Sequence, residues 1–93
     1  MREISITELQ NLKIGQAENA RAGTGCTVFL LGENGAPVGL DVRGGGPASR
    51  ESELLKPTAA AQVIHAILLG GGSAFGLDAA GGVMRYLEEH DIG

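Results

Sequence analysis

The chain has 93 residues, of which 43% are hydrophobic and 3% aromatic, and its formal net charge is -4. This length allows at most one domain, with a modest core of Ala, Val, Ile and Leu. The acidic balance without a Lys/Arg cluster argues against a nucleic-acid surface, and the single Cys26 excludes an internal disulfide. The apolar stretches fall short of the ~20 residues that a membrane span needs. We therefore expect a cytoplasmic protein.

The first clear element is a strand at Cys26–Leu31, which is apolar on both faces, after a polar loop at Gly15–Gly25. The pair Asn34-Gly35 then predicts a hairpin with a second strand at Pro37–Val42. A strand that is apolar on both faces is covered on both sides, so this sheet is expected inside a layered structure, with Cys26 as a small buried hydrophobe. The chain is therefore expected to need further material around it.

A loop rich in Gly, Pro and charge follows at Arg43–Thr58, and its last residue is a candidate cap for a helical turn at residues 59–62. The stretch Val63–Leu69 reads as a strand. Apolar residues then recur every three or four positions, which predicts a helix over Gly76–His90. Its adjacent Gly81 and Gly82 cost roughly 1 kcal/mol each relative to Ala, which indicates close approach by another helix or a sheet.

The Gly-rich turn Gly70–Gly76 joins the predicted strand to the predicted helix. Backbone N–H groups at such a helix start suit an anion or a developing oxyanion. The spacing fits neither nucleotide-binding pattern, because Phe75 stands where GxGxxG needs glycine and no Lys follows. A purely structural tight turn stays open, but we favour a substrate or oxyanion wall within a larger enzyme. Its expected substrate-binding residues are Gly71, Gly72, Ser73, Ala74 and Phe75.

Other polar residues carry weaker signals. Asp41 and Arg43 lie two apart on one face at the end of a predicted strand and are expected to form a buried or half-buried ion pair. His65 reads as a histidine of the core or a sheet edge, and His90 suits a helix C-terminus. Ser73 reads as an N-cap, and as a nucleophile it would need a base such as His65. No metal or cofactor is expected.

Five blocks of sequence, in the same order, resemble the amino-terminal part of the DmpA-type (L-aminopeptidase/D-esterase) peptidases. They are Thr24–Val28, Asp41–Gly45 with Pro47 and Arg50-Glu51, His65–Leu69, Gly71–Leu77 and Gly82–Glu89. The resemblance implies an α/β fold that is part of a four-layer αββα sandwich, of which residues 1–93 form an incomplete amino-terminal portion with a hairpin, a strand, the Gly-rich loop and a helix.

The resemblance also implies autoproteolysis, in which a precursor cuts itself before a Ser or Thr that becomes the nucleophile, with its own α-amine as base. The implied substrates are amino acid amides, esters and short peptides. The family's nucleophile, oxyanion Asn and acidic partner have no counterpart here, so no residue is assigned as catalytic. A complementary carboxy-terminal chain and a homo-oligomer are the expected partners.

Two alternatives stay open at this point. In the first alternative to the peptidase interpretation, the chain is a non-catalytic fragment that folds with a complementary chain. In the second, it is a small phosphate-binding module that uses the Gly70–Gly76 turn.

Overall fold

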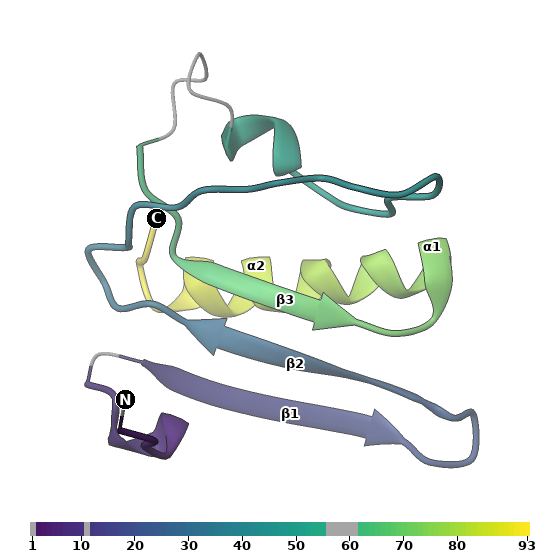
Figure 1. The fold of residues 1–93 in the computed structure, drawn as a ribbon, viewed down its shortest axis with the longest axis horizontal. Helices are drawn as coiled ribbons and strands as arrows, with labels where there is room; N and C mark the ends of the chain where they lie inside the picture. The colour runs from purple at the N-terminus through teal and green to yellow at the C-terminus, as the bar shows by residue number, and fades with distance from the viewer. Residues whose placement is uncertain (1, 11, 56–61) are drawn as a thin grey trace.

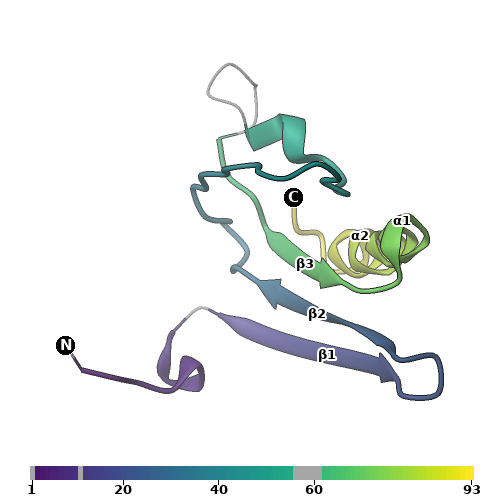
Figure 2. The same cartoon turned by 45° about the vertical axis from the view of Figure 1, so that its right-hand side comes forward.

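A computed structural model describes residues 2–10, 12–55 and 62–93, and shows a three-stranded antiparallel sheet with a helical segment along one face (Figures 1 and 2). The sheet order is β1-β2-β3, with β1 at Lys13–Asn19, β2 at Thr24–Leu30 and β3 at Ala66–Gly70. The helical elements are the 3-10 helices η1 (Ile6–Glu8), η2 (Ser52–Leu55) and η3 (Leu77–Ala79), and the α-helices α1 (Ser73–Gly76) and α2 (Ala80–Glu89).

The hairpin of this sheet joins β1 to β2, and not β2 to the segment after it. In its turn the N–H of Ala22 donates to Oδ1 of Asn19 at 3.1 Å, and Gly23 adopts φ 66°. The expected loop at Gly15–Gly25 is therefore wrong, since most of it is strand. All seven β1 residues are exposed, and a strand with little apolar surface gives no hydrophobic period to detect.

The predicted hairpin through Asn34-Gly35 is also wrong. A turn does form there, with the N–H of Gly35 donating to the carbonyl of Gly32 at 3.1 Å. Among the described residues, the pairing that follows is limited to an isolated bridge between Ala36 and Ile64. Residues 37–42 form no strand. The physical reason is that β1 and β3 occupy both edges of β2 and leave no edge for this segment.

The strand predicted at Val63–Leu69 is confirmed as β3, with a later start, and the predicted helix is confirmed as α2. Helical backbone begins earlier than expected, because α1 and η3 precede α2. A Cβ built at Gly81 or Gly82 meets nothing within 4 Å. The close approach expected there does not occur among the described residues. The helical turn expected at residues 59–62 lies mostly outside them, since only residue 62 is described.

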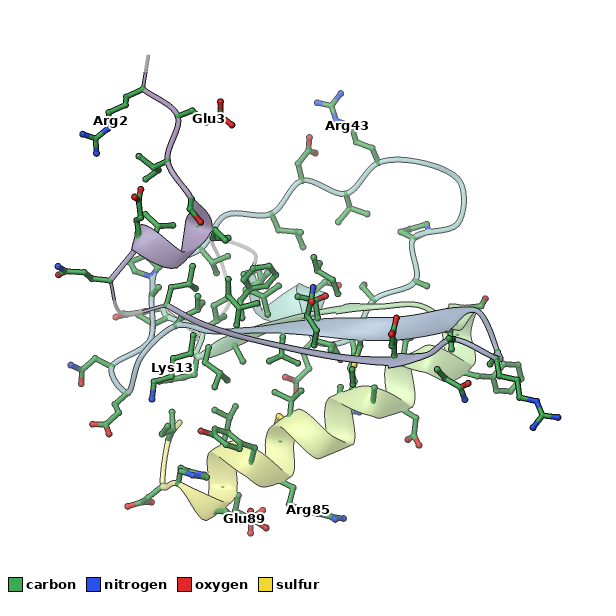
Figure 3. All side chains as sticks on the ribbon, turned by 90° about the horizontal axis from the view of Figure 1, so that it is seen from below. Arg2, Glu3, Lys13, Arg43, Arg85 and Glu89 are labelled. Carbon is green, nitrogen blue, oxygen red and sulfur yellow. The ribbon has the colours of Figure 1, made fainter. Side chains whose placement is uncertain are left out.

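The two faces of the sheet differ. Figure 3 shows α2 on one side of the sheet, and the amino-terminal segment and the loop bearing Arg43 on the other. Along β3, Ala66 and Leu68 are half-buried while Ile67 and Leu69 are 38% and 58% exposed. Because α2 contacts β3, this alternation places Ala66 and Leu68 under the helix. The register then puts four apolar residues on the open face: Ile14, Phe29, Ile67 and Leu69.

No described residue is fully buried, apolar or polar. Cys26, expected to be buried, is half-buried, and every residue of β2 is half-buried although β2 is the central strand. Helix α2 covers one face of the sheet, while the amino-terminal segment and the loop bearing Arg43 leave Ile67 and Leu69 exposed on the other face, which we call the open face (Figure 3). Among the described helices none is long and apolar enough to cross a membrane.

Candidate functional site

The Gly-rich turn is held against the β1–β2 hairpin by its backbone. β3 ends at Gly70, and the N–H of Gly71 donates to the carbonyl of Gly25 at 2.8 Å. Gly72 then takes φ 88° and Ser73 φ 57°, and the N–H of Gly76 closes the turn on the carbonyl of Gly72 at 3.0 Å. The turn is therefore a fixed structure that continues the β2–β3 ladder by one bond.

Close packing explains why these positions are glycine. A Cβ at Gly71 would lie 2.6 Å from Oγ1 of Thr24, and a Cβ at Gly76 would collide with the carbonyl of Gly71. Gly72 has the left-handed backbone that residues with a side chain rarely adopt. At these three positions the backbone of the turn therefore leaves no room, or no accessible conformation, for a residue with a side chain.

Ser73 does not act as an N-cap, contrary to the prediction. Gly72 holds the N-cap position, and none of the described side chains caps the helix. Ser73 is the first residue of α1 and has a positive φ, which is uncommon for a residue other than glycine. Moreover α1 has only four residues before η3 begins. Such a short helix has a small dipole, so it gives little support to the phosphate-binding alternative.

Ser73 and His65 do not form a nucleophile–base pair. They lie at opposite ends of β3, and a five-residue strand spans about 17 Å. His65 is half-buried, and its carbonyl accepts a hydrogen bond from the N–H of Leu31 at 2.9 Å. It therefore has the role of a histidine at the sheet, as expected.

A hollow of about 720 Å³ lies where the turn meets the β1–β2 hairpin. Its lining residues are Gln16, Ala17, Glu18, Ala20, Gly23, Thr24, Gly25, Cys26, Thr27, Leu69, Gly71 and Gly72. Of the five expected site residues, the structure brings Gly71 and Gly72 into the hollow and leaves Ser73, Ala74 and Phe75 outside it. All five are exposed, and Phe75 is 92% exposed.

The sequence prediction missed the wall that β1 and β2 contribute to this hollow. Nε2 of Gln16 donates to Oγ1 of Thr27 at 3.3 Å, so these side chains share one face of the sheet beside Glu18. Reading the polar residues of β1 as a loop hides their alternation. Once this segment is known to be a strand, its period of two places Ile14, Gln16 and Glu18 on one face.

Comparison with known proteins identifies the lineage of the chain. The sequence profile of peptidase family S58 matches residues 5–93. The chain belongs to peptidase family S58. An uncharacterized aminopeptidase of Mycobacterium leprae is 42% identical over 96 residues, which cover 96% of this chain and 26% of that protein. An uncharacterized aminopeptidase of Mycobacterium tuberculosis (strain H37Rv) has the same identity, with 28% of its length covered. The chain thus spans about a quarter of the length of these relatives.

The polar pairs elsewhere in this S58 chain lie at its surface. Asp41 and Arg43 form the expected ion pair, with Oδ2 and Nε 2.6 Å apart, but the side chains are 71% and 87% exposed. The expected burial is wrong, because residues 37–42 leave the sheet. An exposed pair of this kind contributes at most about 1 kcal/mol to stability.

At the end of α2 the ring of His90 stacks on Tyr86, with ring centroids 4.0 Å apart, and its Nδ1 lies 2.8 Å from the Tyr86 carbonyl oxygen. His90 is the C-cap residue of α2, which agrees with its expected place at the helix end. In the part of this S58 chain that the structure describes, no three His, Cys, Asp or Glu side chains gather in a way that could hold a metal ion.

Proposed function

We propose that this chain supplies one wall of the active site of an S58 aminopeptidase, whose nucleophile lies outside residues 1–93. The match of the S58 profile to residues 5–93 carries the proposal, and the names of the mycobacterial relatives agree with it. The complete enzyme then hydrolyses amino-terminal peptide, amide or ester bonds through a Ser or Thr that autoproteolysis exposes, as the DmpA resemblance implies.

The fold proposed for the complete domain is the αββα sandwich. Its outer helix layer and one sheet correspond to α2 and β1–β3, and the second sheet stacks on the face that carries Ile67 and Leu69. Apolar residues that a lone sheet leaves at 38% and 58% exposure become covered in that arrangement, and burial of apolar surface is the main favourable term in such packing. The complementary chain and a homo-oligomer complete the proposed assembly.

The proposed role of the Gly-rich turn is to present backbone donors to the acyl group. The N–H groups of Gly72, Ser73 and Ala74 have no hydrogen-bond partner among the described residues. When the hydroxyl oxygen of the nucleophile attacks the substrate carbonyl, negative charge develops on the carbonyl oxygen. A fixed N–H aimed at that oxygen stabilises the transition state more than the bound substrate.

The substitution Ala74→Pro tests this role in the assembled enzyme. Ala74 lies in the first turn of α1, where its N–H makes no bond within the helix, so proline removes one donor without breaking a helix hydrogen bond. Because the proline ring also restricts the preceding Ser73, whose φ is 57°, urea unfolding of the variant is compared with that of the unaltered enzyme. We expect kcat for amino acid p-nitroanilides to fall by about 100-fold with a smaller change in KM. The control Ala74→Gly keeps the N–H and should retain most activity. An unchanged kcat in Ala74→Pro would show that this N–H is not a donor to the reacting group.

A second measurement tests where the nucleophile lies. The 93-residue chain alone should hydrolyse neither p-nitroanilides nor esters of amino acids above background, since His65, the candidate base, lies at the far end of β3 from Ser73. Turnover that survives repurification and disappears in Ser73→Ala would instead make Ser73 the nucleophile.

A further inference from the structure

The two outer edges of the sheet differ in chemistry. β1 carries Lys13, Glu18 and other polar side chains, and every one of its residues is exposed. β3 has the sequence AILLG, without a charge, a proline or a bulge. Sheet edges of native proteins are commonly protected by charged side chains, proline or bulges. β1 therefore has the features of a true edge strand, and β3 those of an interior strand.

Backbone hydrogen bonds at both ends of β3 establish which of its groups face outward. Leu31 donates to the carbonyl of His65 at 2.9 Å, and Gly71 donates to the carbonyl of Gly25 at 2.8 Å, so the odd-numbered residues of this segment bond to β2. Ile64 faces the other way, since it exchanges bonds of 2.8 and 2.9 Å with Ala36. In an antiparallel ladder this direction alternates. The N–H and C=O groups of Ala66, Leu68 and Gly70 therefore point away from β2.

These outward groups have no partner among the described residues. Ala36 forms an isolated bridge to Ile64 just before β3 begins. Residues 37–50 then pass outside the outer edge of β3 in Figure 1 without pairing to it. The edge is thus opened by one bridge and left unpaired over the whole length of β3. Backbone groups of this kind require a partner once the surrounding apolar surface is covered.

We infer that the outer edge of β3 pairs with a further β-strand, which comes from the part of the S58 polypeptide outside residues 1–93. The inference rests on the proposed function, because it assumes that this chain works within a complete S58 enzyme. The mycobacterial relatives have almost three-quarters of their length outside the matched region, which is a sufficient source of chain.

The incoming strand has a defined chemistry. Its main chain bonds to Ala66, Leu68 and Gly70, and its side chains extend the two faces of the sheet beside them. Ile67 and Leu69 lie on the open face at 38% and 58% exposure, so apolar side chains on that face of the incoming strand would cover them. The added strand makes β3 an interior strand next to the Gly-rich turn, and this fixes the turn on both sides.

Amide hydrogen exchange tests the inference with this chain and the unmatched part of the M. tuberculosis aminopeptidase, produced together. On association we expect the amides of Ala66, Leu68 and Gly70 to exchange on the order of 100-fold more slowly. The outward amides of β1, such as that of Gln16, serve as an internal control and should keep their fast exchange. Protection of β1 but not of β3, or failure of the two parts to associate, would overturn the inference.

A pair of proline variants tests the same edge by affinity. Leu68→Pro removes an outward N–H and places a ring in the path of the incoming strand, so binding should weaken on the order of 100-fold. It also removes a half-buried side chain from beneath α2, and Leu68→Ala, which keeps the N–H, is the control for that loss. Gln16→Pro makes the matching change on the opposite edge and should bind like the unaltered chain. Exchange of the Ile67 and Leu69 amides, which bond to β2, shows whether the Leu68→Pro chain keeps its sheet. If it does not, the exchange measurement on the unaltered chain decides alone.

The identity of the occupant and the activity of the complex are separate outcomes. A dimer of the isolated chain with slow exchange at Ala66, Leu68 and Gly70 would make a second copy the occupant and overturn the assignment. An assembled complex with a protected β3 edge but no hydrolase activity would count against the proposed function and leave the inference standing. An active complex in which the amides of that edge exchange fast would support the proposed function and overturn the inference.

Discussion

Gly71 and Gly76 meet backbone to backbone across the Gly-rich turn, and this contact determines what each position tolerates. A Cβ at Gly76 would collide with the carbonyl of Gly71, which is held in turn because the Gly71 N–H bonds to Gly25. In contrast Gly81, at the start of α2, has open space around its Cβ position. Replacing glycine by alanine is therefore expected to have opposite effects on stability at Gly76 and at Gly81.

We predict that Gly76→Ala lowers the free energy of unfolding by about 2 kcal/mol or more, because backbone atoms cannot move aside as a flexible side chain does. Gly81→Ala should raise it by about 0.5 to 1 kcal/mol, because alanine reduces the entropy of the unfolded chain and favours helix. Urea unfolding followed by circular dichroism measures both. Equal effects of the two substitutions would contradict the proposed contact at Gly76.

At the scale of elements, the β1–β2 hairpin forms one wall of the hollow and depends on a short turn. Gly23 takes φ 66°, and its N–H donates to the carbonyl of Ala20 at 3.3 Å. The preceding Asn19 supplies the side-chain oxygen that accepts from Ala22. Since β1 has little apolar surface, this turn and the ladder to β2 are what hold it in place.

Gly23→Ala is expected to destabilise the hairpin by about 1 kcal/mol, because a side chain disfavours the left-handed backbone. The matched control is Gly15→Ala within β1, where φ is ordinary and nothing lies within 4 Å of the Cβ position. There we expect no loss, and a gain of up to about 1 kcal/mol. Amide exchange of the β1 residues that bond to β2 is the measurement. Faster exchange in the control than in Gly23→Ala would refute this account of the turn.

At the scale of the whole molecule, the part of the chain that the structure describes forms a sheet and a helical segment without a buried core. None of its described residues is buried, and Phe75, Leu69 and Val42 are exposed by 92%, 58% and 54%. A domain of this size ordinarily buries a substantial part of its surface. The apolar surface that stays exposed supports the proposal that this chain packs against further protein.

The isolated chain should bind the dye ANS strongly, because the apolar residues of the open sheet face remain in contact with solvent. Association with the complementary part of an S58 enzyme should lower the ANS fluorescence as that face is covered. A denatured sample in urea provides the baseline. Negligible dye binding by the folded, isolated chain would mean that its apolar residues pack together more closely than the structure shows.

The local sequence pattern was sufficient to predict β2, β3 and α2. The apolar run at Cys26–Leu31, the run at Val63–Leu69 and the three-to-four spacing after Ser73 each carry their signal within a few residues. The Gly-rich turn was likewise predictable, since successive glycines mark a backbone path that other residues cannot follow. Membership of the peptidase family also followed from short blocks of sequence.

Pairing between distant segments depended on the folded arrangement. Asn34-Gly35 is a local turn signal, but β1 and β3 take both edges of β2, so residues 37–42 leave the sheet and carry the Asp41–Arg43 pair to the surface. Hydrogen bonds to β2 hold the polar strand β1 in the sheet. Its residues show no alternation of apolar and polar side chains from which a strand could be predicted. The hollow beside Gly71 and Gly72 likewise depends on the folded arrangement. Its lining residues are far apart along the chain, so no local sequence pattern reveals it.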